Sequence, residues 1–137
     1  MKISIITITL NSEKTIRDTL NSVLSQTYKN IEHILVDGGS TDQTLAILKR
    51  YPNIKKKIFI KKKTRIYSAM NHGIKKASGD VIAILNSDDV YHSNKTISET
   101  INIIKNNPKK NIFFGDVAYF EKNNFYKVNR YYSAKKF

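Results

Sequence analysis

Along residues 1–105, short runs of β-branched residues alternate with longer segments in which apolar residues recur every three or four positions. The runs are typical of buried strands, and the longer segments are typical of helices with one apolar face. The expected strands cover residues 2–10, 31–36, 58–60 and 81–85. One helix is expected to begin after Ser12. Three more are expected over residues 43–50, 66–77 and 96–105. This alternation predicts an α/β fold with a parallel sheet and right-handed crossovers.

Two of these elements carry a more detailed prediction. Residues 81–85 are five apolar residues in a row, which predicts a central strand buried on both faces. The helix over residues 66–77 is expected to turn one apolar face toward the sheet. That face consists of Ile66, Met70, Ile74 and Ala77.

The last third of the chain shows a different pattern. Residues 111–116 form a short apolar run that predicts another strand. Residues 117–128 favour a hairpin that turns at Lys122-Asn123-Asn124. Residues 129–137 show no clear period and are expected to be loosely ordered. We therefore expect one domain over residues 1–128, followed by an irregular tail.

Polar residues follow the first two strands at their carboxyl ends, which is where open parallel sheets bind ligands. Thr9 and Asn11 follow the first strand, and Asp37 begins the turn after the second. An acidic side chain at this place suits a hydrogen bond to a nucleotide ribose or base edge. The alternative is that turns simply favour Asp, Gly and Ser. Neither G-x-G-x-x-G nor a Walker A sequence occurs, so these two phosphate loops are excluded.

The run over residues 81–85 leads directly into Asn86-Ser87-Asp88-Asp89. Two adjacent carboxylates repel each other, and a divalent cation commonly keeps such a pair together. The motif therefore predicts a metal–diphosphate site at the end of a strand. The alternative is that Asp88 or Asp89 caps the helix that follows.

The composition narrows the class of protein. The chain has 137 residues and no cysteine, which excludes a disulfide framework, a thiolate zinc site and a cysteine nucleophile. No apolar run approaches the roughly 18 residues of a membrane span. The amino terminus lacks the cleavage site of a signal peptide. We therefore expect a cytoplasmic protein.

The net charge of +13 is concentrated in residues 51–137, which hold 18 basic and 6 acidic residues. Such a surface attracts nucleic acid, anionic lipid or a phosphorylated ligand. However, 20 of the 24 basic residues are Lys, beside 20 Ile and 14 Asn, and these three amino acids rise together in AT-rich coding sequence. Lys-rich surfaces also lack the planar forks of Arg that read bases. We expect no nucleic-acid partner and keep a basic nucleic-acid binder as the alternative.

The most basic stretch surrounds the short strand over residues 58–60. Lysines commonly protect an edge strand from pairing with other chains, and this is the preferred interpretation. A phosphate-binding role for residues 61–65 is the alternative.

Five blocks of residues occur in a fixed order along about residues 3–120. They are Thr9-x-Asn11, Val36-Asp37-Gly38-Gly39-Ser40-Thr41-Asp42, Ile66-Tyr67-Ser68-Ala69-Met70-Asn71-x-Gly73, Ser78-Gly79-Asp80 and Leu85-Asn86-Ser87-Asp88-Asp89. In this order and spacing, the chain resembles the bacterial family-2 glycosyltransferases of the GT-A fold. Because five blocks agree, the resemblance is more specific than any one of them.

The resemblance implies a three-layer α/β/α fold with a mostly parallel sheet, of the nucleotide-diphospho-sugar transferase type. It also implies an inverting enzyme that takes a sugar from a nucleotide diphosphate, with Mg²⁺ or Mn²⁺ as cofactor. The residues that it implies for binding the nucleotide sugar are Thr9, Asn11, Asp37, Gly38, Ser40, Met70, Asn71, Ser87 and Asp88. Asp89 is implied as the metal ligand.

The chain departs from the family pattern in two places. Lys63-Thr64-Arg65 stands where members carry Asp-x-Gly, and Ser68 replaces an Asp. We expect a nucleotide contact there to be lost or reversed in sign. The family's catalytic base lies downstream, in an acceptor-side half that this chain does not complete, so the fold is expected to be truncated at its C-terminus. The catalytic residue is therefore unknown, and Asp116 is the first candidate.

The expected function is metal-dependent transfer of a sugar in the synthesis of a cell-surface polysaccharide or glycan. The acceptor is an unidentified glycan or a lipid-linked molecule. A lipid-linked acceptor extends the expected location to the inner face of the membrane, with a peripheral association. The alternative is a catalytically weak or inactive fragment that binds a nucleotide sugar.

Overall fold

The computed structural model describes residues 1–52, 56–121 and 124–134. They belong to two compact units, residues 1–101 and residues 102–137. In chain order the elements are β1 (Ile3–Thr9), α1 (Ile16–Leu24), β2 (Ile31–Asp37), α2 (Thr44–Arg50), β3 (Lys56–Ile60), α3 (Ile66–Lys76), β4 (Val81–Ile84), α4 (Thr96–Asn106), β5 (Val117–Glu121) and β6 (Asn124–Tyr132). Among the described residues, no helix has both the length and the apolar character needed to cross a membrane.

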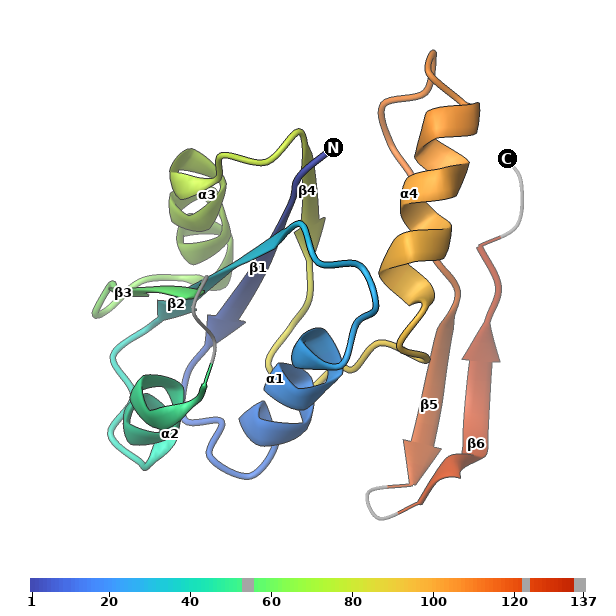
Figure 1. Cartoon of the computed structure of the whole chain (residues 1–137). Coiled ribbons are helices and arrows are strands. Elements are labelled where there is room, and N and C mark those ends of the chain that lie inside the picture. Colours follow the sequence, from blue (N-terminus) through green and yellow to red (C-terminus); the bar gives the residue numbers. More distant parts are fainter. Residues whose placement is uncertain (53–55, 122–123, 135–137) are drawn as a thin grey trace. The chain divides into compact units, whose positions relative to one another are not determined.

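The first unit contains a four-stranded sheet in the order β3-β2-β1-β4, and all its strand pairs are parallel (Figure 1). The register of β1 with β2 runs from Ile3 opposite Ile31 to Thr9 opposite Asp37. Every residue of β1 is buried, and the strand order places β1 and β2 in the interior of the sheet. Neighbouring parallel strands end at the same edge of the sheet. The register therefore brings the predicted site residues of β1 and β2 together.

The prediction that residues 81–85 form a central strand, buried on both faces, is wrong. Within the described sheet, β4 pairs only with β1 and is an edge strand. The side chains of Ile82 and Ile84 are 44% and 43% exposed. An apolar run indicates that its side chains tend to be buried, but it does not indicate which strands will pair with it on either side.

Helices cover both faces of this sheet, which confirms the three-layer α/β/α arrangement with a parallel sheet (Figure 1). On one face, Leu35 of β2 packs with residues of α1 and α2. On the other face, Ile6 and Ile8 of β1 pack with Ala69 of α3. The two cores leave the carboxyl edge of the strands to the loops that follow them.

Helix α3 approaches the sheet through small residues rather than through the face that its apolar spacing predicts. Ala69 and Gly73 are its buried residues, whereas Ile66 and Ile74 are exposed. A Cβ atom added at Gly73 would lie 2.5 Å from Cγ2 of Ile6. The expected inward positions of Ile66 and Ile74 are therefore wrong, because close contact with β1 requires glycine at the crossing point.

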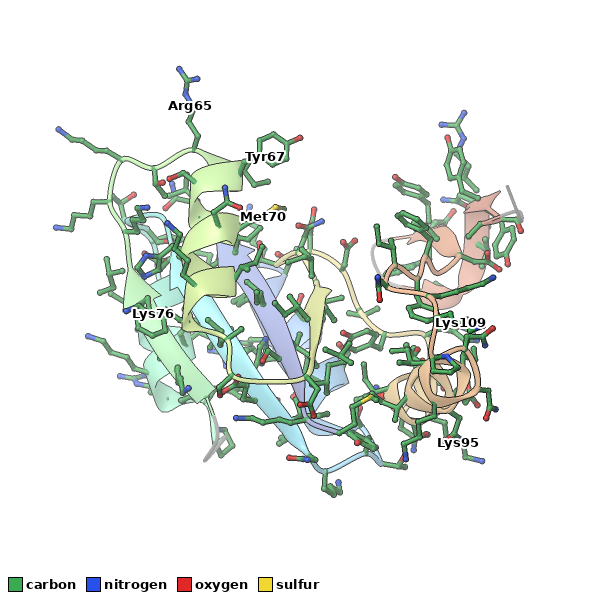
Figure 2. All side chains as sticks on the ribbon, turned by 90° about the horizontal axis from the view of Figure 1, so that it is seen from above. Arg65, Tyr67, Met70, Lys76, Lys95 and Lys109 are labelled. Carbon is green, nitrogen blue, oxygen red and sulfur yellow. The ribbon has the colours of Figure 1, made fainter. Side chains whose placement is uncertain are left out.

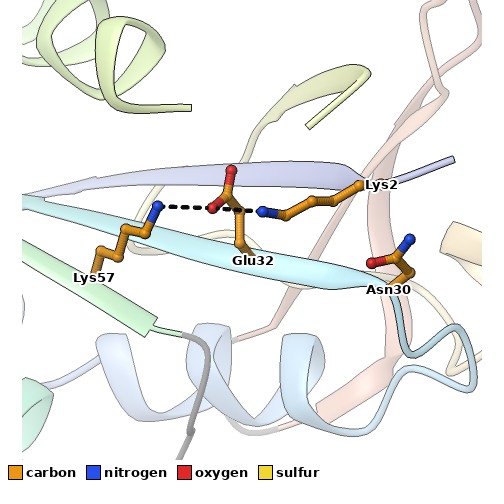
Figure 3. Close-up of a pocket in the computed structure, with 4 residues that line it drawn as sticks. All are labelled: Lys2, Asn30, Glu32 and Lys57. Carbon is orange, nitrogen blue, oxygen red and sulfur yellow. Dashed lines mark hydrogen bonds and ion pairs between the residues drawn. The ribbon is translucent and has the colours of Figure 1, made fainter. Parts of the chain in front are cut away.

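The amino edge of the sheet is closed by a buried carboxylate (Figure 3). Oε1 of Glu32 accepts hydrogen bonds of 2.6 Å from the Ser4 hydroxyl and from the Ser78 backbone N–H. Oε2 forms ion pairs with Lys2 at 3.1 Å and with Lys57 at 3.0 Å. Burial raises the pKa of Glu32, but these hydrogen bonds outweigh it and hold the pKa well below its usual range. The network ties β1, β2 and β3 to the turn before β4.

The second unit contains an antiparallel hairpin of β5 and β6, which confirms the predicted hairpin. The predicted turn over residues 122–124 lies largely outside the described residues. Two other expectations are wrong. Residues 111–116 form no strand, and β6 extends through Tyr132, so residues 129–132 belong to the hairpin rather than to an irregular tail. The domain boundary expected at residue 128 falls inside this strand.

His33 makes the stability of the fold dependent on pH. Burial lowers the pKa of this side chain from 6.5 to about 4, and its Nε2 shares a 2.9 Å hydrogen bond with the Thr7 hydroxyl. As the pH falls from 6.5 to 4, His33 becomes protonated in the unfolded chain but stays neutral in the folded chain. The free energy of unfolding should therefore fall by about 3 kcal/mol over this range.

Urea unfolding at a series of pH values measures this loss. The variant His33→Gln should show a flatter dependence between pH 6.5 and 4, and His92→Gln, at an exposed position, should behave like the unmodified chain. An unchanged slope in His33→Gln would contradict the assignment.

Candidate functional site

The loops that follow β1 and β2 are joined by hydrogen bonds at the carboxyl edge of the sheet. The backbone N–H of Gly38 donates to the carbonyl of Thr9 at 2.8 Å. The N–H of Asn11 donates to the Ser40 hydroxyl at 2.9 Å, and the N–H of Thr41 donates to Oδ1 of Asn11 at 2.9 Å. Asn11 adopts a left-handed backbone with φ of 50°, which Asn tolerates better than most residues. Four predicted site residues are thus brought into one cluster.

A second set of hydrogen bonds extends this junction toward the two helices. The N–H of Ser12 donates to the Thr44 hydroxyl at 2.7 Å. The N–H of Glu13 donates to Asp42 at 3.1 Å, and the N–H of Gln43 donates back to Glu13 at 2.9 Å. The starts of both strand–helix connections are therefore held as one framework, although the sequence separation is about 30 residues.

Asp37 organises the turn after β2. Its side chain is fully buried, and Oδ1 accepts backbone N–H bonds from Gly39 at 2.9 Å and from Ser40 at 2.8 Å. Oδ2 accepts the Ser40 hydroxyl at 2.6 Å. Gly39 has a φ of 99°, a conformation that glycine adopts without strain. The structure thus gives Asp37 a role in the turn, and its contact with a nucleoside stays a prediction.

The acidic motif forms a turn immediately after β4. The N–H of Asp89 donates to the carbonyl of Asn86 at 3.2 Å, and Nδ2 of Asn86 donates to Oδ2 of Asp89 at 3.0 Å. The Ser87 hydroxyl shares a 2.9 Å hydrogen bond with the Ser12 hydroxyl, which joins this turn to the loop after β1. The side chains of Asp88 and Asp89 are exposed.

The alternative role of this acidic pair as a helix cap is wrong. Helix α4 begins only at Thr96, seven residues after Asp89. A capping side chain must lie directly before the first turn, where its oxygen can reach the unpaired N–H groups. Helix capping therefore does not explain why two carboxylates are adjacent at the end of a strand.

Two buried oxygen atoms at the same edge of the sheet lack a partner within the part of the chain that the structure describes. They are Oγ1 of Thr9 and Oδ1 of Asn86. A buried polar atom without a hydrogen bond costs about 1–3 kcal/mol, so each one calls for an explanation such as a ligand, an ion or an ordered water. Thr9 is a predicted site residue. Asn86 is not, although its position before Ser87 at the end of an apolar run is a signal that could have identified it.

The two predicted site residues of α3 have different surroundings. Met70 is partly buried and packs against the core that contains Ile6 and Val36. Asn71 is exposed on the same helix. The structure therefore gives Met70 a packing role and leaves Asn71 accessible to a ligand.

Asp116 lies in the second unit, where it is bonded to β6 and to the residues that follow this strand. Its carboxylate accepts a hydrogen bond from the Tyr131 hydroxyl and a 2.6 Å bond from the N–H of Ala134. The hydrogen bond from Tyr131 is the main cause that lowers the pKa of Asp116. A lower pKa makes a carboxylate a weaker base, so this environment does not favour proton abstraction. Its role as a catalytic base stays a prediction.

The donor set suits a hard cation that also binds substrate phosphates. Among the described residues, no group of three or more His, Cys, Asp or Glu side chains could enclose a metal. Mg²⁺ does not need such a group, because it keeps waters and phosphate oxygens and takes one or two carboxylates from the protein. Asp89 could supply such a carboxylate, and the hydrogen bond from Asn86 orients it. The residues therefore fit the predicted cofactor.

Solved structures share this fold. S. aureus TarS 1–349 in complex with UDP-GlcNAc superposes with a TM-score of 0.72 and 32% identity, over 77% of this chain and 32% of that chain. The mannosyltransferase PcManGT from Pyrobaculum calidifontis, described in complex with GDP-Man and Mn²⁺, superposes with a TM-score of 0.71 and 20% identity. That match covers 91% of this chain and 37% of the other, and it supports the fold alone.

The family model for glycosyl transferase family 2 matches residues 4–137. A protein of Rickettsia bellii described as an uncharacterized glycosyltransferase is 40% identical over 124 residues, which cover 88% of this chain and 18% of that protein. A PGL/p-HBAD biosynthesis glycosyltransferase of Mycobacterium bovis is 35% identical over 117 residues, with coverages of 83% and 46%. The chain belongs to glycosyl transferase family 2, and it spans less than half the length of these relatives.

Proposed function

We propose that the chain binds a nucleotide-diphosphate sugar at the carboxyl edge of β1, β2 and β4. It would thereby supply the donor half of an inverting, metal-dependent glycosyltransferase. The observation that carries this proposal is the junction of three loops through Asn11, Ser40, Ser12 and Ser87, with two exposed carboxylates beside it. The similarity to TarS, which was solved with UDP-GlcNAc, supports the class of donor.

We assign the residues of this edge to different parts of the nucleotide-sugar donor. Thr9, Asn11 and Asp37 are assigned to the nucleoside, and Ser87 and Asp88 are assigned to the ribose and its diphosphate. Gly38 and Ser40 are assigned to the turn beside the nucleoside, and Met70 and Asn71 are assigned to the nucleotide sugar without a more specific contact. A Mg²⁺ or Mn²⁺ ion held by Asp89 would neutralise charge that develops on the leaving diphosphate.

The acceptor is proposed to be a glycan or a lipid-linked molecule in the synthesis of a cell-surface polysaccharide or glycan. The membership of the family and the biosynthetic role in the name of the mycobacterial relative support this assignment. We propose a cytoplasmic location, which a lipid-linked acceptor would extend to the inner face of the membrane. A donor panel tested by hydrolysis and transfer identifies the sugar and the base.

The first test concerns Asp89. The variant Asp89→Ala should lose the Mn²⁺-dependent part of its affinity for UDP, because the ion loses its principal carboxylate. Isothermal titration calorimetry with UDP, with and without Mn²⁺, measures this loss. Glu99→Ala removes an exposed carboxylate from α4 and serves as the matched control. Unchanged Mn²⁺-dependent affinity in Asp89→Ala would sink the assignment.

The second test separates the two roles of Asp37. Asp37→Ala should weaken binding of UDP by about 1–3 kcal/mol, the scale of a hydrogen bond to a charged group. Asp37→Asn keeps an oxygen that can accept the N–H bonds of Gly39 and Ser40, but it lacks the charge. Weaker binding in both variants supports a contact with the nucleoside. If Asp37→Asn binds UDP like the unmodified chain, Asp37 is only a turn residue.

The third test concerns turnover. We expect residues 1–137 to bind a nucleotide sugar but to transfer the sugar slowly, because Asp116 is engaged by Tyr131 and Ala134. General-base assistance is worth roughly 10²–10⁴ in rate, so its loss leaves little transfer. A radiolabelled transfer assay on an acceptor panel measures the rate. Robust transfer that Asp116→Asn abolishes would contradict this expectation and identify the base.

A further inference from the structure

Basic residues are separated from acidic residues along the chain. Residues 43–79 contain eleven Lys and Arg residues and no Asp or Glu. A general rise of Lys in the composition explains the number of lysines, but it does not explain a stretch of 37 residues without one acidic side chain. These residues include β3 and α3, so the separation in sequence becomes a separation on the surface of the first unit.

Some of these basic side chains have interaction partners within the fold. Lys57 is paired with Glu32, Nζ of Lys56 donates to the carbonyl of Leu48 at 2.7 Å, and Lys76 lies 5.7 Å from the centre of the Phe59 ring. These lysines cluster toward the amino edge of the sheet, where they have structural partners. Their positions need no ligand.

The connection from β3 to α3 concentrates exposed basic residues within a short segment. We call residues 60–67 the β3–α3 loop. Lys62, Lys63 and Arg65 are exposed, and none of them forms an ion pair with another described residue. Arg65 projects away from the start of α3 (Figure 2). Three free cations are therefore displayed within four residues.

The loop has a defined position. The N–H of Lys61 donates to the carbonyl of Asp37 at 2.7 Å, and its Nζ donates to the Ser68 hydroxyl at 3.2 Å. A Cβ atom added at Gly39 would lie 3.1 Å from Cγ of Lys62, so the loop packs on the turn after β2. The free cations are thus held at the rim of the candidate site.

Apolar side chains flank these cations. Ile60 is 51% exposed, Ile66 is 55% exposed and Tyr67 is 75% exposed. Tyr67 also points outward from α3 (Figure 2). A single exposed apolar residue is ordinary, but three within eight residues that also carry four cations match the composition of a segment that lies in a bilayer interface. Tyr is enriched at that depth, and Lys and Arg are attracted by anionic headgroups.

We propose that the β3–α3 loop docks the protein on an anionic lipid surface, with Lys62, Lys63 and Arg65 on the headgroups and Ile66 and Tyr67 inserted between them. Nucleic acid is the less suitable partner. Ile60 and Ile66 would make no favourable contact with a phosphate backbone, and the loop has one aromatic ring on which a base could stack. Docking through this loop also turns the rim of the site toward the bilayer. That orientation rests on the proposed function, whereas docking itself does not.

The test uses the full chain and two kinds of vesicle, without nucleotide. One is phosphatidylcholine alone, and the other is phosphatidylcholine and phosphatidylglycerol in equal parts. Co-sedimentation should show binding only to the second. The triple variant Lys62→Gln, Lys63→Gln, Arg65→Gln should bind these vesicles about 100-fold more weakly. The control variant Lys95→Gln, Lys109→Gln, Lys110→Gln removes the same charge elsewhere and should lose only a few-fold.

A second variant tests the apolar part. Ile66→Ser with Tyr67→Ser keeps every charge and should weaken binding about 10-fold, with the larger loss at high salt, because the remaining attraction is screened. Circular dichroism confirms that each variant is folded. Equal losses in both triple variants, equal binding to both vesicles, or tighter binding to a single-stranded oligonucleotide would overturn the proposal. Calorimetry with UDP on the unmodified chain tests the proposed function separately.

Discussion

The candidate site depends on the parallel register of β1 with β2. Because Thr9 lies opposite Asp37, the two strands end together and their loops start side by side. The Ser40 hydroxyl accepts the N–H of Asn11, and the side chain of Asn11 accepts the N–H of Thr41, so each loop completes the hydrogen bonds of the other. A shift of the register by one residue would reverse the faces of the strands and separate these partners. The geometry of the site is therefore a consequence of the pairing at the centre of the sheet.

The two edges of the sheet treat polar groups in opposite ways. At the amino edge, Glu32 is buried, and its carboxylate interacts with two lysines and two serines of the same unit. At the carboxyl edge, Asp88 and Asp89 are exposed, and the buried oxygens of Thr9 and Asn86 lack partners among the described residues. Satisfied polar groups stabilise a fold, whereas accessible ones are available to a ligand. The fold thus pairs its buried carboxylate at one edge and leaves two carboxylates accessible at the other.

The basic residues follow the same division. Near the amino edge, Lys57 is paired with Glu32, Lys56 donates to a backbone carbonyl, and Lys76 lies over an aromatic ring. In the β3–α3 loop, Lys62, Lys63 and Arg65 are exposed beside exposed apolar side chains, whereas Lys61 donates to Ser68. The departure of this chain from its family at Lys63-Thr64-Arg65 therefore falls at the place where the fold displays free charge. Membership of glycosyl transferase family 2 accounts for the site, and the loop adds a feature of this particular chain.

The sequence by itself determined the elements of the first unit and the class of its fold, because runs of β-branched residues and helical spacing reflect local preferences. It also indicated which turns are candidates for the site, since Asp37 follows an apolar run directly and the pair Asp88-Asp89 follows one after two polar residues. Only the tertiary structure decided that β4 is an edge strand and that α3 meets the sheet through Gly73. It also decided that β6 continues to Tyr132. These features depend on which segments become neighbours, and an apolar pattern records the tendency to be buried without naming the partner.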